Sequence, residues 1–459
     1  MKKILLGSTA LAVGGLMAAP AMAADPIKIG VGGYYQFFAL AGAVEGVYAL
    51  NGSSVQYKGL QFIQEGEIHF IGQTKLDNGT TFGIRVELEG WDPANTSTTT
   101  TGTRQIDEAY LFAFGDWGRV EFGAKDDAAY IMYYGAPSAL LGFGWFQHNT
   151  SFQWQNPQVA AANIAAQHTT FNTIDGEFQD ENRFNYYTPR IYGFQVGASY
   201  APKMQPQTLQ GAQWGLAAGP SINTGAVCGF ADATTANTCP TNDNSWQDAL
   251  AIGMNYLNKF GDVSVAAYAA YSYANFVPSL NQLAGNNFNT VNGAGYTSWR
   301  EAVFGLQFSY AGFTLGGSYG WDNNGLAWNG YTGVDNDTRI WAVGLMYETG
   351  PWQLSVGADW AINDNGNGIP SFGTCTQGTT SACTLNAAAT PTAYFGTNPN
   401  TGAASFGAVT ASIIEIGANY AIGPGIKFMG GAVINNASGP SNATAAQSWA
   451  ILFGMDFRF

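Results

Sequence analysis

Segments in which apolar residues alternate with other residues recur from residue 26 to the end of the chain, and this alternation constrains the fold most. A period of two places the apolar side chains on one face of a β-strand. The segments come in pairs, and a short turn rich in Gly, Asn, Asp or Pro joins the two members of each pair. Seven such turns lie at 76–80, 115–118, 190–194, 258–262, 310–313, 348–352 and 422–425.

The pairs are connected to one another by long stretches rich in Asn, Thr, Gly, Ala and Ser. Together, short turns and long connections predict sixteen antiparallel strands, although the pattern also admits fourteen or eighteen. The alternation places all long connections at one end of the sheet, as in outer-membrane barrels with short periplasmic turns and long external loops. The long connections lie at roughly 41–56, 92–102, 125–182, 203–246, 274–298, 323–336, 363–406 and 437–446.

The N-terminal residues 1–23 have the features of a secretory signal peptide. Lys2 and Lys3 precede a short apolar run, which ends in the small-x-small sequence of residues 21–23. A retained membrane anchor is the alternative, but the run is short for one, and no later run approaches the ~18–20 apolar residues of a membrane helix. We therefore expect an exported protein whose barrel spans residues 24–459.

The composition favours a protein whose surface is largely out of contact with water. Charged residues make up 10% of the chain, whereas ordinary soluble domains have about 25%. The chain has 17 basic and 31 acidic residues, and loss of Lys2 and Lys3 with the signal peptide would leave a net charge of −16. This balance argues against nucleic acid as a partner and favours cations in any aqueous interior.

The last segment, "SWAILFGMDFRF", alternates up to Phe459. In a barrel this strand must pair with the first, "PIKIGVGGYYQFF", because unpaired backbone groups cannot face hydrocarbon. Asp456 and Arg458 should then face the lumen. The alternate residues should face lipid, namely Trp449, Ile451, Phe453, Met455, Phe457 and Phe459.

Several stretches resemble Gram-negative general, non-specific porins of the alphaproteobacterial type. Residues 65–90 resemble the second hairpin of that family, 108–127 the hairpin before its constriction loop, and 182–201 the hairpin after it. The terminal "GMDFRF" resembles the family's C-terminal assembly signal. Gly454, Phe457 and Phe459 take the positions of the signal, whereas Leu452 departs from it, since a polar residue is usual there.

The resemblance implies an all-β protein, a 16-stranded antiparallel transmembrane β-barrel in the outer membrane. It also implies a homotrimer in which each barrel encloses its own water-filled pore, narrowed by an inward-folded third loop. Outer-membrane lipid, lipopolysaccharide and the outer-membrane assembly machinery would be its partners. Neither a cofactor nor catalysis is expected.

The charged residues around the long connection at 125–182 are candidates for the pore constriction. In the hairpins on either side, apolar residues occupy alternate positions, so the charged positions between them face the lumen; a charge on the lipid face would cost ~2–4 kcal/mol. A basic wall would consist of Arg85, Arg119, Lys125 and Arg183. An acidic loop opposite it would carry Asp126, Asp127, Asp175, Glu177, Asp180 and Glu181.

Opposed charges across a narrow aqueous passage would create a transverse field, and the acidic surplus predicts a weakly specific filter that prefers cations. The alternative is that these residues are ordinary solvated charges at a barrel rim. A second alternative is a substrate-specific channel with a sugar slide formed by aromatic side chains. The aromatic residues of the long connection that could form it are Tyr130, Tyr133, Tyr134, Trp145 and Phe146.

Two non-channel functions are less compatible with the sequence. An outer-membrane lipase would need a nucleophile, and "GGSYG" at 316–320 matches G-x-S-x-G but lies inside an alternating strand, with no later His. The only histidines are His69, His148 and His168. A secreted β-sandwich adhesin is the other alternative, and it would not need detergent.

The cysteines form two close pairs, and export to an oxidising compartment favours loop disulfides within each pair. Zinc is the rival, but the spacings are wrong for it. The pairs are Cys228 with Cys239 and Cys375 with Cys383.

Other metal sites are weakly indicated. His69 shares a face with Glu65 and Glu67, which could bind a divalent ion or form a polar network. Residues 334–338 and 363–368 resemble calcium loops without their full ligand spacing. Calcium in the loops stays open.

Overall fold

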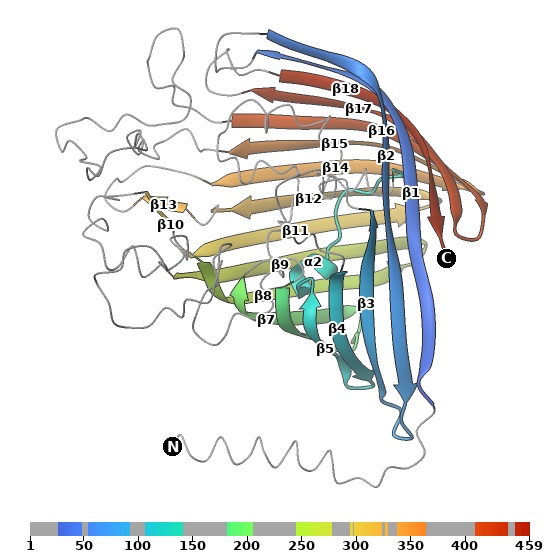
Figure 1. Ribbon diagram of the computed structural model, residues 1–459, viewed down its shortest axis with the longest axis vertical. Helices are drawn as coiled ribbons and strands as arrows, with labels where there is room; N and C mark the ends of the chain where they lie inside the picture. Colours follow the sequence, from blue (N-terminus) through green and yellow to red (C-terminus); the bar gives the residue numbers. More distant parts are fainter. Residues whose placement is uncertain are drawn as a thin grey trace, which may run out of the picture.

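The computed structural model describes residues 26–47, 54–91, 106–140, 181–204, 245–277, 294–296, 298–323, 326–328, 337–363, 409–438 and 446–459. Sixteen strands in this part of the chain form a closed antiparallel barrel (Figure 1). Each strand pairs with its neighbours in barrel order, and β1 pairs with both β2 and β18. The fold class and the number of barrel strands predicted from the sequence are therefore confirmed.

The barrel strands are β1 (Lys28–Val47), β2 (Ser54–Lys75), β3 (Thr81–Trp91), β4 (Ile106–Gly115), β5 (Gly118–Lys125), β6 (Glu181–Tyr187), β7 (Phe194–Met204), β8 (Ser245–Phe260), β9 (Val263–Val277), β11 (Trp299–Tyr310), β12 (Phe313–Asp322), β14 (Thr338–Thr349), β15 (Trp352–Asn363), β16 (Val409–Gly423), β17 (Ile426–Ser438) and β18 (Ala446–Arg458). A short helix, α2 (Ala128–Ile131), follows β5, and β10 (Ala294–Tyr296) pairs with β13 (Leu326–Trp328) as a separate two-stranded sheet. Within the described residues, no helix is long and apolar enough to cross a membrane.

All seven predicted turns are found between the strands of a hairpin. Gly79 and Gly312 have φ of 84° and 83°, the left-handed conformation that favours glycine in tight turns. Two features differ from the prediction. Strands β1 and β2 pair as far as Val47 and Ser54, so the first long connection is shorter than expected. The β10–β13 sheet was not predicted, because three-residue strands are too short to show alternation.

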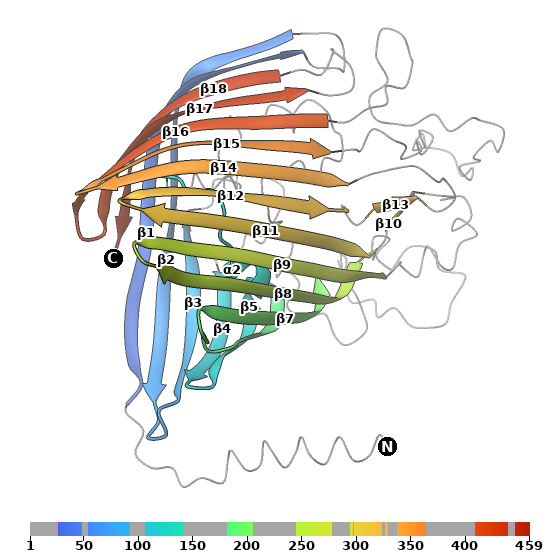
Figure 2. The ribbon, with the colours of Figure 1, turned by 180° about the vertical axis from the view of Figure 1, so that it is seen from behind.

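The alternation along each strand separates an exposed apolar face from an inner face. The six residues of the last segment that were predicted to face lipid are all exposed, while Asp456 of β18 is buried on the other face. Figure 2 shows the opposite side of the barrel, where β7, β8, β9, β11 and β12 lie side by side. The exposed apolar belt has the character of a lipid-facing surface.

The seam of the barrel forms between the two ends of the described chain. β1 and β18 pair from Tyr34 with Arg458 to Gly46 with Ala446. The C-terminus lies beside the turn between β16 and β17 (Figure 1), where Arg458 donates its backbone N–H to the carbonyl of Gly425 at 2.7 Å. The predicted pairing of the last strand with the first is thus confirmed.

Several predicted features lie outside the described residues. They are the signal peptide at 1–23, the two cysteine pairs, Asp175, Glu177, Asp180, Trp145, Phe146, His148, His168 and most of the two calcium-like loops.

Candidate pore constriction

Residues 126–140, which we call the constriction segment, leave the end of β5 and run along the inner wall of the barrel. Figure 1 shows α2, near the start of this segment, within the curved sheet. Hydrogen bonds attach the segment to successive strands. Its bonds to β7, β11, β15 and β16 join Ala128 N to Ser199 Oγ (2.7 Å), Gln307 Nε2 to the Gly135 carbonyl (2.7 Å), Ala139 N to Ser355 Oγ (2.9 Å) and Asn419 Nδ2 to the Ala139 carbonyl (2.7 Å).

Glycines on the inner wall allow the backbone of the segment to approach closely. A Cβ atom on Gly253 would lie 2.7 Å from the Ala128 carbonyl oxygen, and one on Gly344 would lie 2.6 Å from the Pro137 carbonyl oxygen. A Cβ on Gly305 would collide with the Tyr134 carbonyl oxygen. Because any side chain at these positions would displace the segment, the wall itself determines its path.

The far end of the described segment is held by apolar packing. Leu140 is fully buried and belongs to one cluster with residues of β1, β16, β17 and β18. Leu452, the departure from the porin assembly signal, is also a member and is 2% exposed. The other buried members are Phe38, Leu40, Ile413, Met429, Val433 and Ala450.

The start of the segment is held by charges. Lys125 donates to Glu108 of β4 at 2.5 Å, and its Nζ lies 3.7 Å from Asp126. Arg183 of β6 lies 3.5 Å from the carboxylate of Asp127, which also accepts the backbone N–H of Tyr130 at 2.9 Å as the cap of α2. Predicted members of the basic wall and of the acidic loop are therefore in direct contact here.

Burial changes the acidity of both aspartates in the segment. It raises the pKa of Asp126 to about 7, against the opposing attraction of Lys125. Burial also raises the pKa of Asp127, although the Arg183 guanidinium opposes this shift. The charge at the start of the constriction segment therefore depends on pH near neutrality.

A second ion pair lies on β5. Arg119 Nε donates to Glu121 at 2.6 Å, and the other carboxylate oxygen of Glu121 accepts from Asn185 Nδ2 at 3.1 Å. The Arg119 guanidinium also lies 4.9 Å from the centre of the Phe112 ring, within the range of a cation–π interaction.

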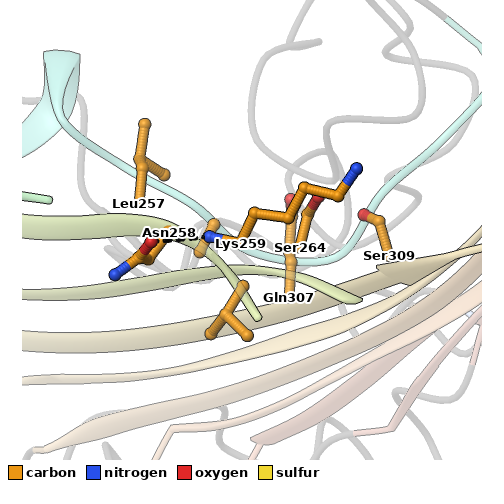
Figure 3. Close-up of a pocket in the computed structure, with 8 residues that line it drawn as sticks. Leu257, Asn258, Lys259, Ser264, Gln307 and Ser309 are labelled. Carbon is orange, nitrogen blue, oxygen red and sulfur yellow. Dashed lines mark hydrogen bonds between the residues drawn. The ribbon is translucent and has the colours of Figure 1, made fainter. Parts of the chain in front are cut away.

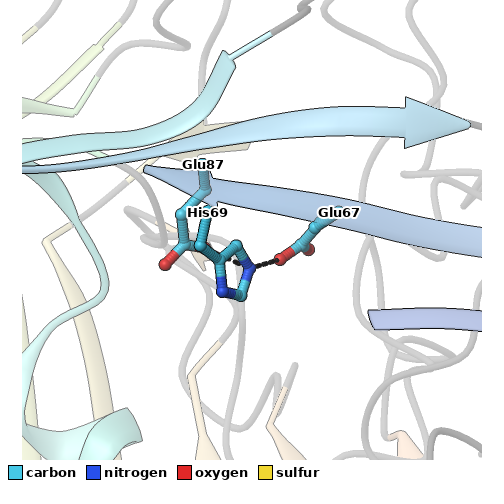
Figure 4. A group of neighbouring side chains, drawn as sticks. All are labelled: Glu67, His69 and Glu87. Carbon is cyan, nitrogen blue, oxygen red and sulfur yellow. Dashed lines mark hydrogen bonds and ion pairs between the residues drawn. The ribbon is translucent and has the colours of Figure 1, made fainter. Parts of the chain in front are cut away.

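Arg85 belongs to a network on β2 and β3. His69 Nε2 lies 2.7 Å from Glu67 and His69 Nδ1 lies 3.0 Å from Arg85 Nη2, while Arg85 Nε pairs with Glu87. Figure 4 shows His69 between the carboxylates of Glu67 and Glu87. Glu67 also accepts a hydrogen bond from the hydroxyl of Tyr34 at 3.0 Å.

The same network bears on the metal alternative. The ligand atoms of Glu67, His69 and Glu87 lie within 4.8 Å of one another, close enough for a divalent ion. The Arg85 guanidinium can only donate hydrogen bonds, so His69 Nδ1 must accept with its lone pair. The proton of the neutral imidazole then lies on Nε2. A metal bound at Nε2 would need the opposite tautomer. The geometry therefore favours a polar network over a metal site at His69.

The predicted basic residues all lie on the inner face of β3, β5 and β6, and each pairs with a nearby carboxylate. Of the predicted acids, Asp126 and Asp127 begin the constriction segment, and Glu181 is buried at the start of β6. Sequence reasoning missed Glu108, which pairs with Lys125, and it missed the glycines of the wall. Strand parity could have shown that these residues point inward. It could not have shown which segment of the chain lies against them.

The comparisons with known proteins agree with this architecture. Residues 7–277 and 258–458 match the profile of a Gram-negative porin. The chain belongs to the Gram-negative porin family. This porin is therefore an outer-membrane β-barrel channel.

Relatives of the porin include uncharacterized proteins of Rickettsia. One from Rickettsia conorii is 22% identical over 299 residues, which cover 61% of this chain and 67% of the relative. One from Rickettsia prowazekii is 21% identical over 307 residues, covering 62% and 67%.

Two solved structures share the fold. The anion-selective porin from Comamonas acidovorans has a TM-score of 0.50 at 13% identity, covering 94% of this chain and 100% of that one. The outer membrane channel DcaP of Acinetobacter baumannii has a TM-score of 0.50 at 12% identity, covering 95% and 98%. The closed barrel that they share with this porin excludes the β-sandwich alternative.

Proposed function

We propose that the porin is a passive diffusion channel for ions and small hydrophilic solutes, with a preference for cations. The constriction segment would narrow the pore, and diffusion would need neither energy nor a cofactor. We also propose export through a cleaved signal peptide, assembly as a homotrimer among lipopolysaccharide and lipid, and an orientation with the short turns in the periplasm. The resemblance to general porins supports these points.

The observation that carries the proposed selectivity is the surplus of carboxylates around the start of the constriction segment. The basic residues there, Arg85, Arg119, Lys125 and Arg183, each have a carboxylate partner. The carboxylates of β2 to β6 and of the segment start outnumber the basic residues there by ten to six, which gives this side of the pore a negative balance. The acidic residues of β2 to β6 and of the segment start are Glu65, Glu67, Glu87, Glu89, Asp107, Glu108, Glu121, Asp126, Asp127 and Glu181.

The sugar-specific alternative receives less support from the described aromatic residues. The Tyr133 hydroxyl lies 2.7 Å from Ser318 Oγ, and its ring packs edge-on against Tyr268, with centroids 5.4 Å apart. A side chain fixed to the wall in this way is not free to stack against a passing sugar. Ser318, the serine of "GGSYG", lies within β12 and is engaged by Tyr133, which gives no support to a lipase.

Planar-bilayer recording of the purified porin tests the proposal. We expect stepwise channel insertions and, across a gradient of potassium chloride, a reversal potential of the cation-selective sign. A potential of the opposite sign would refute the cation preference, and a failure to conduct under conditions where the barrel is folded would refute diffusion. Concentration-dependent block by one sugar would favour the sugar-specific alternative.

A further inference from the structure

A cavity of about 400 Å³ opens on the inner wall near the turn between β8 and β9. It lies on β8, β9 and β11, away from the acidic network of β2 to β6. The residues that line it are Leu257, Asn258, Lys259, Ser264, Val265, Ala266, Gln307 and Ser309. Figure 3 shows the Lys259 side chain extending past Ser264 toward Ser309.

The strand register brings the polar residues of this cavity into one row. Lys259 is the partner of Ser264 across β8 and β9, Ser264 is the partner of Ser309 across β9 and β11, and Ser309 is the partner of Thr314 across β11 and β12. Directly opposed residues of adjacent strands point to the same face of a sheet. One ammonium and three hydroxyls therefore lie side by side on the inner wall.

The hydrogen bonds leave donors and acceptors in this row for a ligand. The hydroxyls of Ser309 and Thr314 lie 2.8 Å apart, and because one of them donates to the other, the second keeps its proton for another acceptor. Gln307 donates its Nε2 to the Gly135 carbonyl at 2.7 Å, which leaves its Oε1 as an acceptor. Asn258 contributes nothing, because its amide is engaged by Tyr256 and by the Lys259 backbone.

The charge of Lys259 distinguishes it from the bases of the constriction. Each of those bases has a carboxylate partner, whereas the ion pairs of the described residues include none for Lys259. Its side chain is exposed to the cavity. An ammonium with hydroxyls at its side is suited to an oxyanion, because phosphate and carboxylate oxygens accept from both kinds of donor.

We propose that Lys259, Ser264, Ser309 and Gln307 form a binding site for small hydroxylated oxyanions, such as phosphorylated sugars. The phosphate would contact the Lys259 ammonium and the serine hydroxyls, and a hydroxyl of the sugar would donate to Gln307 Oε1. The site goes beyond the proposed diffusion of cations, since it would retain an anionic solute in a pore of negative balance. The role of the site in transport rests on the proposed channel function, whereas the binding of an oxyanion by these residues does not.

The site also has a direct link to the constriction segment. Gln307 contacts both the cavity and the carbonyl of Gly135. A solute bound there would lie one side chain away from the segment that narrows the pore. Occupancy should therefore reduce the ion current as well as retain the solute.

Line broadening of the phosphorus NMR signal tests binding, with inorganic phosphate and a hexose phosphate as probes of the detergent-solubilised porin. We expect saturable broadening of both probes, with the hexose phosphate bound more tightly than phosphate. Lys259→Gln should weaken binding about tenfold, the loss expected for one charge-assisted hydrogen bond. Ser309→Ala should weaken it by a smaller factor, because it removes a neutral donor.

The matched control is Lys75→Gln, which removes a lysine at the turn end of β2, outside the cavity. It should leave binding unchanged. Equal binding by wild type and Lys259→Gln, or equal losses in both lysine variants, would overturn the proposed site.

Bilayer recording separates this inference from the channel proposal. If the porin conducts but the hexose phosphate neither binds nor reduces the current, the site is refuted and the channel stands. If binding depends on Lys259 and no conductance is found, the site stands and the channel proposal fails.

Discussion

Phe459 and Gly33 exchange both of their backbone hydrogen bonds. The Gly33 N–H donates to the Phe459 carbonyl at 3.0 Å, and the Phe459 N–H donates to the Gly33 carbonyl at 3.1 Å. The pair lies at one end of the seam between β1 and β18. Water is absent from hydrocarbon and cannot replace bonds lost at a strand end, so Phe459 contributes through its main chain as well as its ring.

Deletion of Phe459 should therefore destabilise the barrel. Loss of two backbone hydrogen bonds costs about 1–3 kcal/mol, at ~0.5–1.5 kcal/mol each. The temperature at which the folded band disappears on unboiled SDS gels should fall. Phe453→Ala is the control, because it removes an exposed ring from the same strand and keeps the seam intact. An equal temperature for the deletion variant and wild type would contradict this account.

The strands and turns could be predicted because their determinants are local. Alternation in β18 and the Gly-containing turns needs no knowledge of distant residues, and Gly79 and Gly312 are found where the turns require them. Pairing of β18 with β1 followed from the need to satisfy backbone groups in lipid. In contrast, β10 and β13 form only because two separate long connections between barrel strands pair with each other. No local sequence pattern predicts such a contact.

The path of the constriction segment could not be predicted from local patterns. Gly305 and Gly344 are compatible with an alternating strand whether or not another segment lies against them. Only the folded barrel shows that the constriction segment packs against both glycines. Leu452 is similar. It is unusual as part of an assembly signal, but it is explained once Leu140 from a distant loop joins the same buried cluster.

Leu140→Ala should loosen the far end of the constriction segment. Truncation of a buried leucine in a packed cluster costs ~2–5 kcal/mol where the surroundings do not relax, and here relaxation of the segment would reduce that cost. We expect a noisier open-channel current with frequent partial closures in bilayer recordings. Ile451→Ala, on the exposed face of β18, should leave the current unchanged. A quiet current in Leu140→Ala would show that other contacts hold the segment.

Gly305→Ala should shift the segment away from the wall. The new Cβ would collide with the Tyr134 carbonyl oxygen, so the backbone must move toward the pore axis or the strand must bend. Such overpacking costs about 1–3 kcal/mol, and we expect a lower single-channel conductance. Gly423→Ala is the control, because a Cβ there meets nothing within 4 Å. Unchanged conductance in Gly305→Ala would argue against a segment seated on the glycines.

Arg183→Gln should destabilise the start of the segment. The Arg183 side chain is 2% exposed and lies 3.5 Å from Asp127, so its loss leaves a buried carboxylate without this partner. Breaking such a pair costs ~3–5 kcal/mol, measurable by urea unfolding in detergent. Addition of Asp127→Asn should recover part of the loss. Arg458→Gln is the control, since that side chain is 54% exposed in its pair with Asp456 and exposed pairs contribute under about 1 kcal/mol. Full additivity of Arg183→Gln and Asp127→Asn would show that the two residues are not coupled.

The proposed cation preference should depend on pH through Asp126. Because burial raises the pKa of Asp126 to about 7, its carboxyl is ionised above that pH and neutral below it. Acidification from pH 8.5 to pH 5.5 (each about 1.5 units from that pKa) removes one negative charge from the constriction, so the reversal potential in a salt gradient should become less cation-selective. In Asp126→Asn this change should be smaller than in wild type, because Asp127, whose pKa burial also raises, is the titratable aspartate that remains at the start of the segment. Asp116→Asn, in the exposed turn between β4 and β5, is the control and should keep the pH dependence of wild type. If wild type and Asp126→Asn changed equally over this range, another group would be responsible.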